Sequence, residues 1–198
     1  NNGGAGIGGG DSYSGGNITI NGGNVTATGG QYAAGIGGGR IGSGGEITIH
    51  GGSVTATGGD NGAGIGGGIG DEIGGYGGSF TTGTDGHALI VASSISDKSQ
   101  RDSWSGIIFE GDTGTVYGNP TIQENMEIPS GKTLTVPKNI TLTVKDGVTL
   151  TNSGTITNNG TITGNGKVVA IGGDVLWGDG GNLSLIHISE PTRHLRIS

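Results

Sequence analysis

The sequence has no cysteine, few charged residues and few aromatic residues. The absence of cysteine from all 198 residues excludes a disulfide framework and thiolate chemistry. Charged residues make up 13% of the chain, and 9 Lys and Arg residues are outnumbered by 16 Asp and Glu residues. Nucleic acid and anionic lipid attract clustered basic residues, and no apolar run approaches the ~20 residues of a membrane-spanning helix. We therefore expect no nucleic-acid partner and no membrane insertion by this segment.

Glycine, in contrast, is in large excess. It accounts for 50 of the 198 residues, several times its usual share of ~7%. Because glycine has no side chain to bury, a conventional packed core is not expected over the Gly-rich residues 1–86. Stability there would have to come from hydrogen bonds between neighbouring backbone segments and from columns of stacked side chains.

A repeat of fixed length runs through the first part of the chain. Ile7, Ile36 and Ile65 stand in the near-identical contexts GAGIGGG, AAGIGGG and GAGIGGG, each 29 residues after the last. The segment NITINGGNVTATGG at 17–30 returns with the same step as EITIHGGSVTATGG at 46–59. Fixed periods of ~20–50 residues are typical of solenoids.

The repeated segments have the pattern of short β-strands. ITI and VTAT alternate apolar and polar residues, are rich in β-branched residues and are bounded by Gly-Gly. With the Ala-Gly-Ile-Gly-Gly stretch as a third strand, each 29-residue unit forms one coil of a right-handed parallel β-helix, with coils ~4.8 Å apart. A shortened copy at 77–82 extends the pattern. The predicted side-chain columns are Ile7/Ile36/Ile65, Ile18/Ile47, Ile20/Ile49 and Val25/Val54/Phe80.

The Thr-rich segment 121–182 continues the same fold with a different repeat. Segments such as KTLTV, ITLTV and TIT start six to eight residues apart, so that three of them make a coil of about 22 residues. We predict one all-β domain, continuous over about 3–171, with a Gly-poor coil at 87–120 between the two repeat types. The inward side chains would be Leu134, Val136, Ile140, Leu142, Val144, Val148, Leu150, Ile156 and Ile162.

A loop at 97–105, with the sequence DKSQRDSWS, is predicted to project from the Gly-poor coil. Trp104 there is the candidate for ligand binding, because an aromatic face can stack on a sugar ring. The nearby side chains of Asp97, Arg101 and Asp102 would bind the sugar hydroxyls. The alternative is that Trp104 covers the hydrophobic coil beneath the loop.

No pattern of catalytic or metal-binding residues stands out. His50 and His87 follow or precede Gly residues and are interpreted as corner residues. The acids do not recur at one place in the repeat, so no calcium ladder is expected; Asp11, for instance, aligns with Arg40 and Ile69. We expect no enzyme activity, no metal and no cofactor.

Both ends of the chain are unusual. The chain begins within a repeat, and the segment 183–198, LSLIHISEPTRHLRIS, contains no Gly. This segment resembles the translation of an adapter used in sequencing libraries; the alternative is a genuine terminal strand. We expect 183–198 to be non-native and to have no functional role, and 1–182 to be an internal fragment of a longer polypeptide.

The motifs ITINGG, VTATGG and GAGIGGG, followed by PSGKTLTVPKNITLTVKDGVTLTNSGTITNNGTITGNG, resemble large repetitive surface proteins of Gram-positive gut bacteria. These proteins have adhesin-like parallel β-helices of the pectate-lyase-like type. The resemblance covers about residues 3–171. It implies an extracellular location on the bacterial surface and membership of a longer surface polypeptide.

The function expected from this resemblance is that of a monomeric, non-catalytic structural and adhesive segment. One alternative is a carbohydrate-binding module of the same fold, with a host or plant polysaccharide bound near Trp104. Another is a degenerate polysaccharide lyase.

Overall fold

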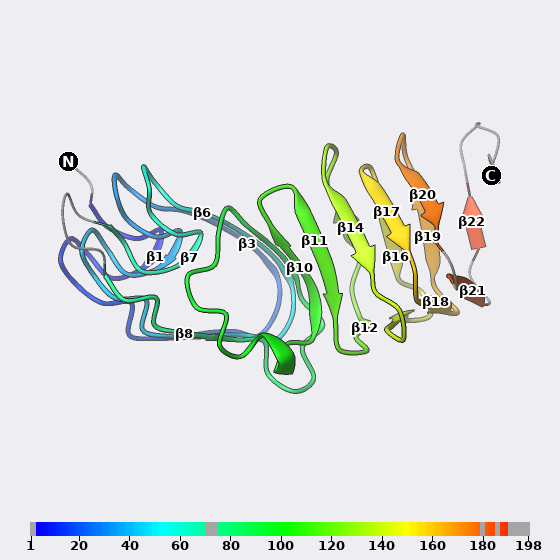
Figure 1. Ribbon diagram of the computed structural model, residues 1–198, viewed down its shortest axis with the longest axis horizontal. Helices are drawn as coiled ribbons and strands as arrows, with labels where there is room; N and C mark the ends of the chain where they lie inside the picture. The colour runs from blue at the N-terminus through cyan, green and yellow to red at the C-terminus, as the bar shows by residue number, and fades with distance from the viewer. Residues whose placement is uncertain (1–2, 70–74, 179–180, 185–186, 190–198) are drawn as a thin grey trace. The chain divides into compact units, whose positions relative to one another are not determined.

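The computed structural model describes residues 3–69, 75–178, 181–184 and 187–189. Short parallel strands stack coil upon coil (Figure 1), so the predicted all-β parallel β-helix is confirmed. The chain divides into two compact units, Asn1–Gly111 (unit 1) and Asp112–Ser198 (unit 2), rather than forming the single continuous domain that we expected. The division falls inside the 87–120 segment. It accompanies a change in coil length, and coils of different perimeter cannot keep every strand in register.

Unit 1 contains three coils of three strands each, followed by one further strand. Equivalent strands of successive coils pair in parallel, in the orders β1-β4-β7, β2-β5-β8 and β3-β6-β9-β10. The first coil holds β1 (Ile7–Gly8), β2 (Asn17–Ile20) and β3 (Asn24–Thr28), and the second β4 (Ile36–Gly37), β5 (Glu46–Ile49) and β6 (Ser53–Thr57). The third holds β7 (Ile65–Gly66), β8 (Ser79–Thr81) and β9 (Leu89–Ala92), and β10 follows at Gly106–Glu110.

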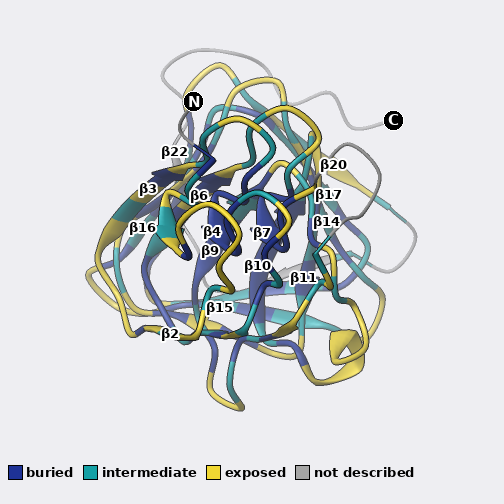
Figure 2. Ribbon diagram, turned by 90° about the vertical axis from the view of Figure 1, so that its left-hand side faces the viewer, coloured by how far each residue is buried: buried dark blue, intermediate teal, exposed yellow. Residues whose placement is uncertain are grey.

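The 29-residue step predicted the register of the first two coils. The columns Ile7/Ile36/Ile65, Ile18/Ile47 and Ile20/Ile49 are confirmed as directly paired residues. Ile36, Ile49 and Ile65 are fully buried. Figure 2 shows β4, β7 and β9 coloured as buried, whereas β2 of the first coil contains exposed residues.

The predicted column Val25/Val54/Phe80 is wrong in its third member. Phe80 pairs with Ile47, in the β2-β5-β8 sheet, and Ile90 is the residue that pairs with Val54. The Gly-Gly-Ser that precedes Phe80 matches the corner before β6 in sequence, but in the fold it leads into the strand that follows β7. The more apolar strand β9, with Ile90 fully buried, then fills the place assigned to Phe80.

The Gly-rich motifs are explained by close contact between coils. Gly8, Gly37 and Gly66 form a column and have φ of 129°, 131° and 136°, which L side chains rarely adopt. A Cβ on Gly8 would lie 2.1 Å from the carbonyl oxygen of Gly37, and one on Gly37 would lie 2.0 Å from that of Gly66. Glycine is therefore required at this place in every coil.

Unit 2 is built from the Thr-rich segments and has three sheets, ordered β11-β14-β17-β20, β12-β15-β18-β21 and β13-β16-β19-β22. Its first strands are β11 (Thr113–Tyr117), β12 (Thr121–Ile122), β13 (Met126–Ile128), β14 (Thr133–Val136), β15 (Thr141–Val144) and β16 (Thr149–Asn152). The remaining strands are β17 (Thr155–Asn158), β18 (Thr161–Gly164), β19 (Lys167–Ala170), β20 (Asp174–Trp177), β21 (Asn182–Ser184) and β22 (His187–Ser189).

The coils of unit 2 are shorter than those of unit 1 and match the predicted length. Leu134 pairs with Ile156, 22 residues later, whereas Leu142 pairs with Ile162 after 20 residues and Leu150 with Val168 after 18. The predicted inward residues are buried, except for Ile140, which is half-buried before β15.

Two inward positions in unit 2 hold asparagine instead of an apolar residue. Asn152 and Asn158 are fully buried. The backbone N–H of Gly154 donates to Asn152 Oδ1 at 3.2 Å, and that of Gly160 donates to Asn158 Oδ1 at 3.1 Å. The two side chains thereby satisfy backbone groups at the corners, which would otherwise be costly to bury.

Part of the segment 183–198 continues these sheets. Leu183 pairs with Ile162, and Ile188 pairs with Val168. This is the arrangement that the terminal-strand alternative predicts. Residues 185–186 and 190–198 lie outside the described residues, so the rest of the prediction for this segment is not tested.

Candidate functional site

Trp104, the residue singled out for ligand binding, lies against the third coil. It follows a short 3-10 helix at Arg101–Ser103 and is only 3% exposed. Its ring packs edge-on against Phe80, with 5.0 Å between the ring centroids. Its indole N–H donates to the carbonyl oxygen of Phe80 at 3.3 Å.

The burial of Trp104 removes the ring face that stacking on a sugar would need. The predicted sugar platform at Trp104 is therefore not formed in this structure. The arrangement is the one that the alternative predicted, in which Trp104 covers a hydrophobic coil. The physical reason is local, because the ring covers Phe80 and its N–H satisfies a carbonyl group of β8.

The other predicted site residues stay near the surface of the loop but do not converge on a pocket. Asp97 is half-buried and accepts hydrogen bonds from Ser99 N at 2.9 Å and Ser99 Oγ at 3.0 Å. Arg101 and Asp102 are exposed, and the guanidinium of Arg101 lies 5.9 Å from the centroid of Trp104. Asp97 thus stabilises the turn of the loop itself.

Ser105 completes the attachment of this loop to the third coil. Its backbone N–H donates to Thr82 Oγ1 at 2.7 Å, and its hydroxyl donates to Gly86 O at 2.7 Å. At the start of the loop, Lys98 Nζ forms an ion pair with Glu110 Oε1 at 2.6 Å. The loop is therefore a cover for β8 and the corner after it, and not a freely projecting element.

The two histidines of unit 1 lie at one corner of successive coils, as their sequence context predicted. The backbone N–H of His87 donates to the carbonyl oxygen of His50 at 2.8 Å. Across the described ranges of the chain, no three His, Cys, Asp or Glu side chains lie close enough together to hold a metal ion.

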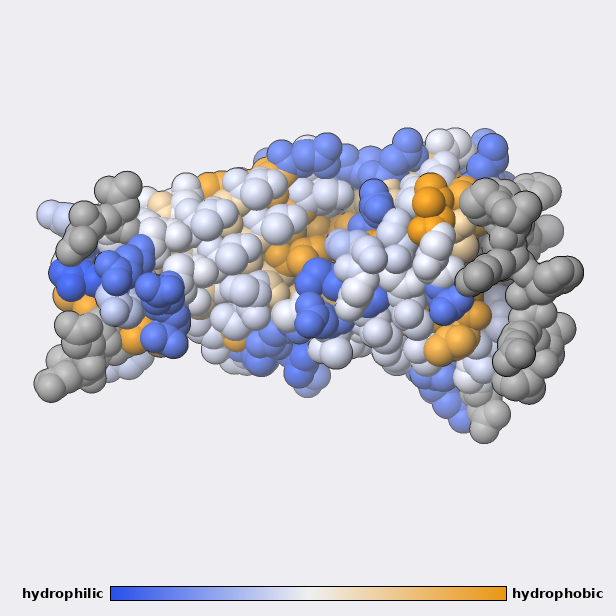
Figure 3. Space-filling model, turned by 90° about the horizontal axis from the view of Figure 1, so that it is seen from above, coloured by the Kyte–Doolittle hydropathy of each residue, from blue (hydrophilic) through white to orange (hydrophobic). Residues whose placement is uncertain are grey.

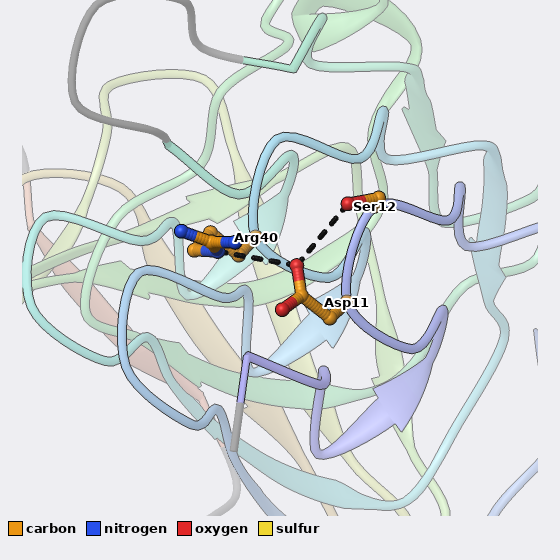
Figure 4. A network of polar contacts seen from close by, with 3 residues as sticks. All are labelled: Asp11, Ser12 and Arg40. Atoms are coloured by element: carbon orange, nitrogen blue, oxygen red, sulfur yellow. Dashed lines mark hydrogen bonds and ion pairs between the residues drawn. The ribbon is translucent and has the colours of Figure 1, made fainter. Parts of the chain in front are cut away.

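An ion pair joins the first and second coils at another corner (Figure 4). Arg40 Nε lies 3.1 Å from Asp11 Oδ1, and the hydroxyl of Ser12 donates to the same oxygen at 3.2 Å. The hydrogen bond from Arg40 is the main cause that lowers the pKa of the Asp11 carboxyl from its ordinary value. The side chains of both partners are about two-fifths exposed.

The same corner gathers the exposed apolar residues of unit 1. We call it the aromatic corner and define it by Asp11, Tyr13, Arg40, Ile41, Ile69 and Tyr76. Tyr13 is 72% exposed and Tyr76 is 85% exposed, although core residues are almost completely buried. Sequence reasoning missed this corner because its members come from three coils and share no motif.

A hollow of about 560 Å³ opens beside this corner, on the first coil. Its lining consists mostly of glycine backbone, with Asp11 and Thr28 as its side chains that carry polar groups. In Figure 3 the hydrophobic surface forms small, separate patches between neutral and hydrophilic areas.

The comparisons with known proteins agree with this architecture. The Beta helix repeat family matches residues 18–40 and 47–69, two segments that begin 29 residues apart like the coils of the structure. Comparison with curated proteins and with solved structures gives no match. Fold and repeat together identify the chain as a repetitive parallel β-helix protein. Among the described residues, no helix has the length and apolar character needed to cross a membrane.

Proposed function

We propose that the chain is a non-catalytic structural and adhesive β-helix segment of an exported bacterial cell-surface protein. The observation that carries the proposal is the unbroken register of the coils. In the second coil, β4, β5 and β6 each pair in parallel with a strand of the coil before and a strand of the coil after. Such backbone pairing makes each unit stiff without a large hydrophobic core.

The use of charged residues supports a non-catalytic role. A lyase on this fold would bring acids for a metal and a basic residue together on one face. The basic residues with ion pairs given above serve contacts instead: Arg40 binds Asp11 of the neighbouring coil, and Lys132 Nζ lies 3.2 Å from Asp112 Oδ1.

The adhesive part of the proposal, and its alternative as a carbohydrate-binding module, draws support from the exposed tyrosines of unit 1. Tyrosine rings that stay in solvent have an apolar face and a polar tip, which suits recognition of a polysaccharide. An extracellular location, a longer parent polypeptide and a monomeric state belong to the same proposal and follow from the resemblance to bacterial surface proteins.

Two measurements test the structural role. In hydrogen exchange on the full chain, we expect amides of β4, β5 and β6 to exchange only as fast as global unfolding allows. Exchange of these amides within seconds in the folded protein would contradict a stiff segment. Incubation with polygalacturonate and Ca²⁺ is expected to leave the polymer intact, and release of unsaturated products would show a lyase instead.

A further inference from the structure

The exposed large apolar side chains of unit 1 are gathered in one place. Tyr13, Ile41, Ile69 and Tyr76 are the described residues of unit 1 in this class, with exposed fractions from 40% to 85%, and all belong to the aromatic corner. Single exposed apolar residues are common on protein surfaces, but residues that gather from three successive coils mark an interaction surface.

The register of the coils fixes how the two tyrosines are related. The backbone N–H of Gly15 donates to Ser43 O, and that of Gly44 donates to Tyr76 O, so Tyr76 occupies the place of Ser43 one coil further on. Tyr13 occupies the place of Gly42, as the bonds Tyr13 N to Gly10 O and Gly42 N to Gly39 O indicate. The tyrosines therefore stand in neighbouring columns, two coils apart, which is ~10 Å along the stack.

Small residues occupy the coil between the two tyrosines. Gly42 and Ser43 leave the surface low there, and Ser43 contributes a hydroxyl. The Asp11–Arg40 pair borders the same surface with one hydrogen-bonding carboxylate and one guanidinium, both partly exposed. Two aromatic platforms, a low floor between them and polar groups at the edge are the elements that recognise a chain of sugar rings.

Charge narrows the class of sugar. Arg40 is the only basic residue in the sequence from 1 to 86, which contains six acids. Its guanidinium is already paired with Asp11. A polyanion such as pectate would be repelled by this half of the chain, whereas a neutral polymer pays no such penalty.

We propose that the aromatic corner binds a neutral polysaccharide, with the rings of Tyr13 and Tyr76 contacting sugar units two coils apart. This inference deepens the proposed adhesive role and moves the sugar contact from the buried Trp104 to a surface that is open to solvent.

The test measures binding of the full chain to immobilised neutral polysaccharides, xylan, galactan and glucomannan, with pectate as the charged comparison. We expect binding to at least one neutral polymer and none to pectate. Tyr13→Ala and Tyr76→Ala should each weaken it at least tenfold. Leu176→Ala, which removes an exposed side chain of unit 2 (53% exposed), is the matched control and should bind like the unchanged protein.

Folding is checked for each variant by circular dichroism and by the unfolding temperature, which should stay constant because both tyrosines are mostly exposed. Folded protein that binds none of the neutral polymers would overturn the inference, as would binding that both tyrosine variants retain. Neither result would affect the structural role, which hydrogen exchange tests separately.

Discussion

The carbonyl oxygen of Tyr13 lies where a side chain of Gly42, its counterpart one coil further on, would have to begin. A Cβ on Gly42 would be 2.0 Å from Tyr13 O, and a Cβ on Gly75 would be 2.0 Å from Gly42 O. The second and third coils therefore need glycine at this place, because a coil lies directly before them. Within the described part of the chain the first coil meets no such carbonyl, and it can hold an exposed tyrosine.

Substitution of this glycine provides a direct test of the coil contacts. Gly42→Ala is expected to destabilise the protein by roughly 3 kcal/mol, because the added methyl group overlaps a backbone atom that cannot move freely. Gly22→Ala is the matched control: it lies outside the left-handed region and has no atom within 4 Å of its Cβ position, so its effect should stay within about 0.5 kcal/mol. Urea denaturation measures both, and equal effects would contradict the stacking described above.

The isoleucine column gives a graded prediction. Ile36→Ala should cost about 2–5 kcal/mol, because Ile36 is fully buried between Ile7 and Ile65. Ile7→Ala should cost clearly less, since Ile7 is only half-buried and has a paired residue on one side. Thermal unfolding of the two variants compares them, and a larger loss for Ile7→Ala would be inconsistent with this register.

Trp104 is expected to matter for stability and not for sugar binding. Trp104→Phe keeps an aromatic ring against Phe80 but loses the N–H that donates to Phe80 O, which should cost about 1–3 kcal/mol. Polysaccharide binding by this variant should equal that of the unchanged protein at a temperature where both are folded. A selective loss of binding would return the sugar site to the loop 97–105.

Acid should weaken the contact between the first two coils. The folded-state pKa of Asp11 is lowered by its hydrogen bond with Arg40, so the contribution of this pair is present above the ordinary Asp pKa of ~3.9. It is lost as the pH falls through the lowered value, where the carboxylate becomes protonated in the folded state. In Asp11→Asn the loss of stability between pH 5 and pH 2, values set by ~3.9 for a free Asp, should be smaller. An unchanged acid profile would argue against the pair.

Most of the fold could be predicted from the sequence because the repeat states the register directly. Ile7, Ile36 and Ile65 share one context, and stacking equal contexts leaves a single alignment. The position of Phe80 could not be obtained in this way. The chain reaches β8 33 residues after β5, as the pairing of Ser79 with Glu46 requires, so the 29-residue rule no longer applies.

The candidate site was harder to predict, for a physical reason. Aromatic residues in loops are ambiguous in sequence, since the same Trp104 can serve as a platform or as a cover. Its burial depends on Phe80, 24 residues earlier, whose own place in the fold the repeat misassigned. The surface around Tyr13 and Tyr76 emerges only when three coils are superposed, because its residues are neighbours in space and not in sequence.

The glycine columns also limit how such a chain can vary in length. Removing or adding one residue inside a coil of unit 1 would shift every later glycine away from the carbonyl that it accommodates, and each misplaced Cβ would collide with a neighbouring backbone. Insertion or deletion of 29 residues as a block leaves all of these contacts in place. Whole-turn duplication is thus the step by which genes of this kind can grow or shrink without passing through an unfolded product.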